Sequence, residues 1–248
     1  MSKITLTAAS RIGCVRTNNE DMILVCDKLI RSDVYSAEFV TETIDRFVIA
    51  VADGMGGHNA GEVASSDVLS NLRFYVNDLP RGLASGEFMD LMHDWLQSVN
   101  HIIASKGHAN PEMLEMGTTM VGIAFYNGKY YWMNCGDSRL YRLRNGELEQ
   151  LSNDHSLSNA RGEKKHTSVV TNCIGAGIRM PYMDMFEFTD DFLPGDQYML
   201  CTDGLNDMIP DDRIRQLMFD HADANTMCEA AIEAGGFDNV SVCSFTVE

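Results

Sequence analysis

The stretch Phe47-Val48-Ile49-Ala50-Val51-Ala52-Asp53-Gly54-Met55-Gly56-Gly57-His58 decides how the middle of this chain folds. Its apolar first half, rich in β-branched residues, predicts a strand that is buried on both faces. The strand ends at Asp53, and the glycines that follow permit a sharp turn and a close approach of backbone carbonyls. Asn59-Ala60-Gly61-Glu62 then opens a predicted helix, with Asn59 as N-cap and Glu62 completing a capping box.

A carboxylate at a strand end, followed by exposed carbonyl oxygens, offers oxygen ligands to a hard divalent cation. The same pattern also fits a strand–turn–helix corner with a solvated aspartate. Three further acidic residues share this context, where a loop meets a predicted strand: Glu20, Asp203 and Asp238. Because close carboxylates raise one another's pKa, such a cluster would need cations to stay ionised. Two divalent ions would neutralise it, with Asp53 as the candidate bridge.

Two acidic sites, the Glu20-Asp21 pair and Asp137, leave alternatives open. Glu20 and Asp21 are adjacent at a strand entrance, so their side chains should point to opposite faces, and only one should face a site directly. A charged turn is the alternative for this pair. Asp137, in Gly136-Asp137-Ser138-Arg139, also follows a strand, but aspartate is favoured in an Asx-type turn in any case.

Composition narrows the class of protein. The chain has 248 residues, 45% of them hydrophobic, and shows neither a Pro/Ser-rich linker nor a repeat, so we expect one domain over residues 1–248. The net charge of −17 disfavours nucleic acid and anionic membranes as partners. Seven dispersed cysteines, an N-terminus without an apolar h-region and the absence of any 18-residue apolar run favour a soluble cytoplasmic protein.

Periodicity and turn signals predict the remaining elements. Asn127-Gly128 and Asn145-Gly146 predict primed two-residue hairpin turns within an antiparallel meander. Residues 30–45 are polar and predict a loop, and residues 152–180 predict a surface excursion with the character of a flap. Expected strands are 4–9, 22–26, 118–126, 130–135, 139–144, 147–151, 183–188, 197–201 and 240–247, and expected helices follow Asn59, span 87–105, begin at Pro210 and span 224–234.

Seven short motifs occur in order along nearly the whole chain. They are Gly13-x-x-Arg16-x-x-Asn19-Glu20-Asp21; Asp53-Gly54-Met55-Gly56-Gly57-His58 with Ala60-Gly61-Glu62; Gly117-Thr118-Thr119; Asn134-Cys135-Gly136-Asp137-Ser138-Arg139; Asp154-His155-Ser156; Thr202-Asp203-Gly204-Leu205-x-Asp207; and Asp238-Asn239-x-Ser241. Together they closely resemble the metal-dependent protein phosphatases, the type 2C Ser/Thr phosphatase family, and in particular its bacterial members.

The resemblance implies an α+β fold, a four-layer α-β-β-α sandwich of two antiparallel sheets flanked by helices. It also implies Mn²⁺ or Mg²⁺ as cofactor, with two core ions. Asp53 would bridge both ions and Gly54 would contribute its carbonyl oxygen. Glu20 would complete one metal site, and Asp203 and Asp238 would complete the other.

Further roles are implied around this core. Arg16 would bind the substrate phosphate with its planar fork of donors, the alternative being a surface salt bridge. Asp21 and Asn239 would lie behind the ligands and orient them or their waters. Asp137 and Asp207 match family residues that hold a third, weaker metal ion.

The implied activity is hydrolysis of phosphoserine and phosphothreonine in proteins by a metal-bridging water, without a covalent phosphoenzyme. Its partners would be phosphoproteins, including a cognate Ser/Thr kinase or that kinase's substrates, and the chain would act as a monomer. A catalytically silent phosphoprotein-binding module on the same fold is the alternative. A two-metal nuclease is disfavoured by the acidic charge.

The chain departs from the family pattern in two regions. Met55 occupies a position where many animal members have a histidine, and a thioether cannot donate a proton, so the general acid is unassigned. The flap at residues 156–170 looks shorter than in typical bacterial members. Asn172 follows Thr171 where the family usually has an arginine, which affects how the region near the flap handles substrate.

Overall fold

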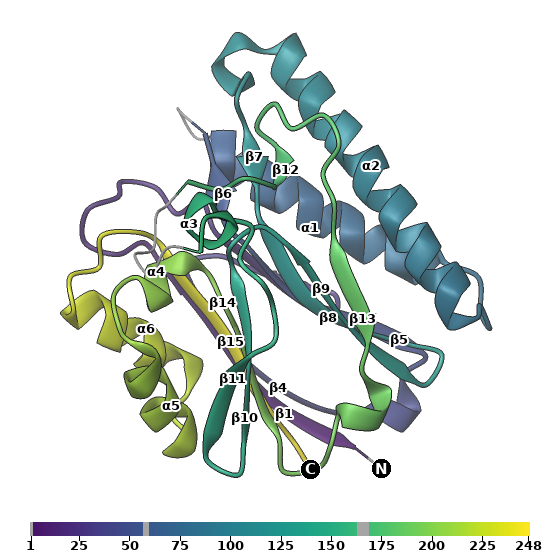
Figure 1. Ribbon diagram of the computed structural model, residues 1–248, viewed down its shortest axis with the longest axis vertical. Helices are drawn as coiled ribbons and strands as arrows, with labels where there is room; N and C mark the ends of the chain where they lie inside the picture. Colours follow the sequence, from purple (N-terminus) through teal and green to yellow (C-terminus); the bar gives the residue numbers. More distant parts are fainter. Residues whose placement is uncertain (1, 57–59, 163–168) are drawn as a thin grey trace.

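Two antiparallel six-stranded sheets form the centre of the molecule (Figure 1). The computed structural model describes residues 2–56, 60–162 and 169–248. The first sheet, sheet A, contains β1 (Lys3–Arg11), β4 (Val34–Val40), β10 (Arg139–Arg144), β11 (Glu147–Gln150), β14 (Gln197–Cys201) and β15 (Val240–Val247). The second, sheet B, contains β2 (Met22–Val25), β3 (Lys28–Ile30), β5 (Arg46–Ala52), β8 (Met120–Tyr126), β9 (Lys129–Cys135) and β13 (Asp184–Glu187).

Short elements and helices complete the chain. A small three-stranded sheet is formed by β6 (Gly54–Met55), β7 (Gly117–Thr118) and β12 (Ile174–Gly175). The α-helices are α1 (Ala60–Asp78), α2 (Ser85–Ala109), α3 (Leu157–Ala160), α4 (Asp203–Asn206), α5 (Asp211–Phe219) and α6 (Ala224–Glu233). The 3₁₀ turns are η1 (Thr41–Thr43), η2 (Pro111–Met113) and η3 (Thr189–Asp191). Strand order is β11-β10-β14-β15-β1-β4 in sheet A and β13-β9-β8-β5-β2-β3 in sheet B.

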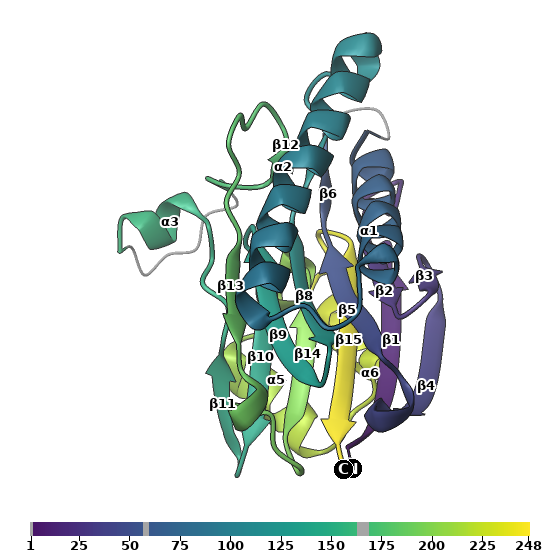
Figure 2. The ribbon, with the colours of Figure 1, turned by 90° about the vertical axis from the view of Figure 1, so that its right-hand side faces the viewer.

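The layers bury three apolar groups of residues. Helices α1 and α2 cover the outer face of sheet B, and α5 and α6 cover the outer face of sheet A (Figures 1 and 2). Trp95 and Phe88 of α2 pack on sheet B, while Phe47 and Phe245 belong to the apolar cluster between the two sheets. Leu217 of α5 packs on sheet A. This arrangement confirms the predicted four-layer α-β-β-α sandwich.

The central stretch folds largely as its sequence predicts. Residues 47–52 of β5 are all buried, and β5 pairs with both β2 and β8 in sheet B. A Cβ atom on Gly54 would lie 2.2 Å from the Gly61 carbonyl oxygen, so only glycines allow α1 to approach the backbone this closely. The predicted Asn59 cap, and His58 with it, lie outside the described residues. The Glu62 side chain pairs with Arg31 at 2.8 Å.

Both hairpin predictions are confirmed. Asn127 and Gly128 have φ values of 50° and 79°, and Asn145 and Gly146 have 53° and 80°. Positive φ at both central residues is what the type I′ turn requires. These turns fix the register of β8 with β9 and of β10 with β11.

The loop prediction for residues 30–45 is wrong, because β4 spans Val34–Val40 within it. β4 lies at the edge of sheet A and pairs with β1. Its residues alternate between exposed and half-buried, so only one face needs apolar side chains. The polar residues of the other face, such as Ser36 and Glu38, make this segment resemble a loop in sequence.

The surface excursion predicted for residues 152–180 is also wrong in part. His155, Asn172 and Ile174 are buried, and β12 pairs with β7. Residues 160–162 are exposed, as expected for a flap, and residues 163–168 lie outside the described residues. Polar side chains at the base of this segment are buried because they bond to one another.

Candidate active site

Strand ends from both sheets bring five aspartates to one edge of the sandwich. Asp53 follows β5, Asp21 precedes β2, Asp137 follows β9, Asp203 opens α4 after β14, and Asp238 precedes β15. The charges of the other four all act on the Asp53 carboxyl group. The structure therefore gathers four predicted ligand or bridging positions, together with Asp21, into one cluster, which we call the Asp53 cluster.

Burial and the charges of neighbouring carboxylates disfavour the ionised forms of Asp53 and Asp21. The pKa of Asp53 is raised well above its ordinary value, first by burial and then by the charges of Asp21 and Asp203. Burial likewise raises the pKa of Asp21 to about 7, although a hydrogen bond from Thr202 Oγ1 at 2.9 Å opposes the rise. A cluster of this kind gains stability from any cation that neutralises it.

The Gly117-Thr118-Thr119 motif fixes the backbone of Asp53, a role that its sequence does not predict. Thr119 N donates to Asp53 O at 2.9 Å, and Asp53 N donates to Thr119 Oγ1 at 3.1 Å. Thr118 Oγ1 adds a second donor to Asp53 O at 2.8 Å. The carboxylate is thus presented from a rigid strand end.

Glu20 and Asp21 both lie near the cluster, because the charge of Asp238 raises the pKa of each; that only one of them faces the site directly stays a prediction. Burial raises the pKa of Glu20, and the charge of Asp238 raises it further. The alternation of a strand does not apply here, because β2 begins only at Met22. Asn239 Oδ1 accepts the backbone N–H of Glu20 at 2.8 Å, which holds Glu20 in place.

Arg16 forms an ion pair with Asp238 at 2.6 Å. This hydrogen bond, assisted by nearby carboxylates, raises the pKa of the guanidinium. Both side chains are partly exposed, 53% for Arg16 and 37% for Asp238. The salt bridge weighed as the alternative for Arg16 is therefore present, and its partner is one of the predicted metal ligands. The phosphate-binding role stays a prediction.

The two residues predicted to hold a third ion differ in their surroundings. Asp137 is 2% exposed and adds to the charge acting on Asp53. Asp207 is exposed, and its backbone N–H donates to Asp203 O at 2.8 Å at the end of α4. Asp137 thus belongs to the cluster, while Asp207 lies at its margin.

One cation near the cluster was missed from sequence. Arg31 Nε donates to Asp21 O at 2.8 Å, and the Arg31 guanidinium pairs with Glu62. Arg31 braces the loop that carries Asp21 against the start of α1. Nothing in the sequence around Arg31 signals these contacts, because it lies in the stretch that we expected to be a loop.

The donor set fits Mn²⁺ or Mg²⁺. Carboxylates and the Gly54 carbonyl are hard oxygen ligands of the kind these ions prefer. As placed, however, no three His, Cys, Asp or Glu side chains within residues 2–56, 60–162 and 169–248 converge on one ion position. The carboxylates repel one another, and Asp238 is turned to Arg16. The chemistry of the residues thus fits the ions.

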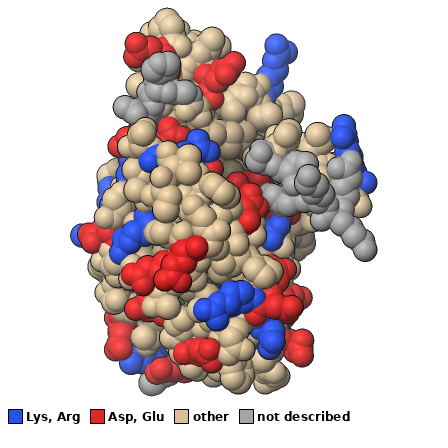
Figure 3. Space-filling model, turned by 90° about the vertical axis from the view of Figure 1, so that its left-hand side faces the viewer, with Lys and Arg blue, Asp and Glu red and all other residues tan. Residues whose placement is uncertain are grey.

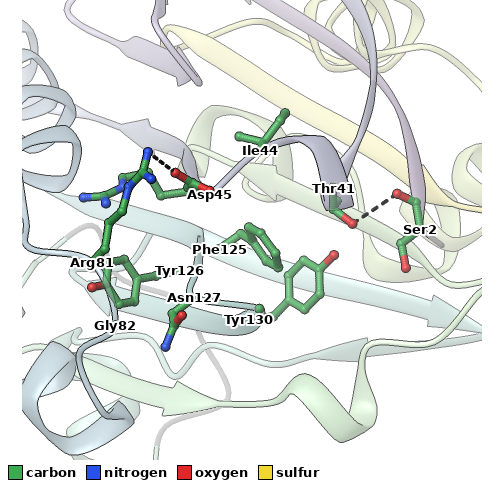
Figure 4. A pocket seen from close by; sticks show the side chains of 12 residues that line it. Ser2, Thr41, Ile44, Asp45, Arg81, Gly82, Phe125, Tyr126, Asn127 and Tyr130 are labelled. Atoms are coloured by element: carbon green, nitrogen blue, oxygen red, sulfur yellow. Dashed lines mark hydrogen bonds and ion pairs between the residues drawn. The ribbon is translucent and has the colours of Figure 1, made fainter.

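A cavity of about 530 Å³ lies elsewhere in the fold (Figure 4). Its walls include Phe125 and Tyr130, and Arg81 pairs with Asp45 at its rim. It lies where β5 and β9 begin, whereas Asp53 and Asp137 follow the ends of those strands. This cavity is therefore separate from the Asp53 cluster.

The surface carries charges of both signs. Figure 3 shows Lys and Arg side chains interspersed with Asp and Glu side chains on one face, without an extended basic area on that face.

Among the described helices, none is both long enough and apolar enough to cross a bilayer.

Comparison with known proteins identifies the family. Residues 27–232 match the sequence profile of the family described as "Protein phosphatase 2C". The chain belongs to this family. Among curated members, PstP of Mycobacterium tuberculosis (strain H37Rv), described as a serine/threonine protein phosphatase, is 31% identical over 98% of this chain. The chain spans only 45% of the length of that relative. Protein phosphatase PhpP of Streptococcus pneumoniae is 30% identical, over 93% of this chain and 92% of its own length.

Several solved structures share this fold. The Streptococcus agalactiae serine/threonine phosphatase superposes with a TM-score of 0.82 at 25% identity, covering 99% of this chain and all of its own. PppA of Pseudomonas aeruginosa, described as a key regulatory component of T6SS, gives 0.79 at 27% identity over the whole of both chains. The catalytic domain of PstP, solved in complex with two manganese ions, gives 0.78 at 30% identity and covers 100% of this chain and 99% of its own.

Proposed function

We propose that this chain is a metal-dependent phosphoprotein phosphatase that hydrolyses phosphoserine and phosphothreonine. The observation that carries the proposal is the Asp53 cluster, in which buried carboxyls of raised pKa lie at converging strand ends. Membership of the 2C family supports the same activity. All four predicted core carboxylates and Arg16 are present, which disfavours the silent binding module.

Two Mn²⁺ or Mg²⁺ ions are the proposed cofactors. Asp53 would contact both ions, Gly54 and Glu20 would serve one, and Asp203 and Asp238 the other. The chemistry that such ions supply is activation of a water for attack on phosphorus and neutralisation of phosphate charge. The chain's own contribution is to hold these oxygens in place, through the Thr118 and Thr119 hydrogen bonds to Asp53.

Arg16 is proposed to bind the phosphate of the substrate. A guanidinium offers two parallel donors to a phosphate, as it does to a carboxylate. Because Arg16 now holds the Asp238 carboxylate at 2.6 Å, phosphate binding would exchange one anionic partner for the other. The exchange is feasible because both side chains are partly exposed.

The surrounding residues complete the proposal. Asp21 and Asn239 orient the ligands: Asn239 holds the Glu20 backbone, and Asp21 is held by Thr202. Asp137 and Asp207 are proposed to hold a third, weaker ion at the margin of the cluster. Met55 cannot donate a proton, so the general acid is unassigned.

We further propose that residues 1–248 form one phosphatase domain that acts as a monomer in the cytoplasm. All seven cysteines are free thiols, which supports a reducing compartment. Its partners would be phosphoserine and phosphothreonine proteins, including a cognate Ser/Thr kinase or that kinase's substrates. Size-exclusion chromatography with light scattering tests the monomer.

Hydrolysis of a phosphothreonine peptide, with and without Mn²⁺, tests the activity. We expect phosphate release that requires the ion and stops on chelation. Tight binding of the peptide without release would instead establish the silent binding module. Full activity after exhaustive chelation would overturn the metal-dependent proposal.

A further inference from the structure

His155 lies between the base of the flap and the corner that carries Asp137. Its backbone N donates to Gly136 O at 2.9 Å, and its ring Nδ1 accepts the Gly136 N–H at 3.1 Å. Both polar groups of Gly136 are thus bound by one buried residue. Asp137 is the next residue, so the orientation of its backbone depends on this clamp.

The hydrogen bonds fix where the ring proton resides. Nδ1 also accepts from Asn172 Nδ2 at 2.7 Å, so Nδ1 faces two donors and carries no proton. The proton is therefore on Nε2, which donates to Asp184 Oδ2 at 3.1 Å. Asp184 selects this form of the ring, and the ring in turn presents an acceptor to Gly136.

The same residue anchors the flap. Thr171 N donates to His155 O at 2.7 Å, and Ser156 bridges to Val170 in the next position. The two backbone segments of the flap therefore leave the body of the protein from His155 and Thr171. Asn172, which replaces the arginine usual in the family, bonds Tyr182 O at 2.8 Å and closes the base.

The corner on the other side of the clamp has no room for a side chain at Gly136. Gly136 has φ +128°, and a Cβ there would lie 2.5 Å from Thr119 Cβ. Thr119 bonds both Asp53 N and the Ser138 hydroxyl. A continuous set of contacts thus runs from the flap base through His155 and Gly136 to the backbone of Asp53.

We propose that His155, oriented by Asp184, is a positioning residue that sets the Asp137 carboxylate for turnover and ties it to the base of the flap. The proposal rests on the phosphatase function and adds a residue that acts through Asp137. His155 does not touch the substrate. This role depends on Nδ1, the ring atom that accepts the hydrogen bond from Gly136 N–H.

Two nearly isosteric substitutions test the roles of the two ring nitrogens separately. In His155→Asn an amide oxygen lies near the position of Nδ1 and can still accept from Gly136. In His155→Gln the amide nitrogen reaches the position of Nε2 and can still donate to Asp184, while the acceptor for Gly136 is lost. His93→Gln is the matched control, because His93 Nε2 contacts only a backbone oxygen, Met183 O, at 3.2 Å among the contacts described.

Steady-state kinetics with Mn²⁺ and a phosphopeptide measure the effect. We expect His155→Gln to lower kcat about tenfold to a hundredfold, as for a group misplaced by about 1 Å, with little change in KM. His155→Asn should stay within about threefold of wild type, and His93→Gln should match wild type. In an Asp137→Ala background, His155→Gln should lower kcat little further, because both changes act on the same carboxylate.

A second readout does not need turnover. Calorimetric titration with Mn²⁺ should show that His155→Gln weakens the weaker binding step, whereas His155→Asn preserves it. An inactive wild type would refute the proposed function but leave this binding test intact. Equal losses in His155→Asn and His155→Gln, or full additivity with Asp137→Ala, would overturn the positioning role.

Discussion

β14 has an aspartate beside each end, and the two have different surroundings. Asp196, just before the strand, is buried and accepts two hydrogen bonds from Arg144 at 2.7 Å. Burial alone would raise the pKa of Asp196, but the bonds from Arg144 and Leu193 lower it. Asp203, just after the strand, joins the Asp53 cluster, and its charge helps to raise the pKa of Asp53.

The difference shows which carboxylates serve the fold. At the Asp196 end the chain provides its own cations, since Arg144 also pairs with Asp191 at 2.7 Å and Arg142 pairs with Asp191 and Glu149. At the Asp203 end the ion pair shown is the partly exposed one of Arg16 and Asp238. Because burial and neighbouring carboxylates raise the pKa of Asp53 and Asp21, we infer that metal ions from solution neutralise the Asp53 cluster.

The largest expected effect is on activity, in Asp53→Asn. The amide keeps the shape of the side chain but removes the charge that would bridge two cations. We expect the Mn²⁺-dependent kcat on a phosphopeptide to fall at least about a hundredfold, while the fold survives. Asp191→Asn, at the arginine-paired end, is the matched control and should keep kcat. Wild-type turnover in Asp53→Asn would contradict the claim that the Asp53 cluster serves activity whereas the Asp196 end of β14 serves the fold.

Asp196→Ala should have the largest effect on stability. It leaves Arg144 and the Tyr198 hydroxyl without their buried acceptor. We expect the free energy of unfolding in urea to fall by about 2–3 kcal/mol, less than for a fully buried pair because Arg144 is partly exposed. Activity per folded molecule should not change. A loss below about 0.5 kcal/mol would show that this ion pair contributes nothing.

Arg16→Lys should alter substrate binding by a smaller amount. Lysine keeps the charge but lacks the planar fork, so we expect KM for a phosphopeptide to rise about tenfold with little change in kcat. Stability should hardly change, because the Arg16 pair with Asp238 is exposed and worth at most about 1 kcal/mol. An unchanged KM would leave Arg16 as a surface salt bridge only.

The smallest expected effect is in the pH dependence of stability. The pKa of Asp191 and that of Asp196 are lower in the folded protein than in the unfolded chain, whose aspartates titrate near about 3.9. Their contribution is therefore present above about pH 4 and is lost as pH falls through the lowered values. The stability difference between wild type and Asp196→Ala should shrink between pH 7 and pH 3. A difference that stays constant would contradict the lowered pKa values.

The sequence predicts the parts of this molecule that local chemistry determines. An apolar run predicts β5, Asn-Gly pairs predict the hairpins, and Asp-Gly pairs after strands predict Asp53 and Asp203 at the site. Each of these signals is contained within a dozen residues or fewer. The ordered motifs then predict the family and, through it, the four-layer arrangement.

Contacts between distant segments could not be predicted in this way. Arg16 and Asp238 are 222 residues apart, and nothing near either residue indicates that they pair. The His155 motif was visible, but Asp184 and Asn172 fix its ring through tertiary packing. β4 was missed because an edge strand needs only one apolar face, so its polar residues resemble a loop.

Thermal unfolding with and without Mn²⁺ tests most directly whether metal ions from solution neutralise the Asp53 cluster. At about a hundredfold excess of Mn²⁺ over Kd, binding should stabilise the wild type by about 2.7 kcal/mol, a rise in Tm of about 5–10 °C for a chain of this size. Asp196→Ala should show the same rise from a lower starting Tm, and Asp53→Asn should lose most of it. No rise in wild type, or equal rises in wild type and Asp53→Asn, would contradict a metal site centred on Asp53.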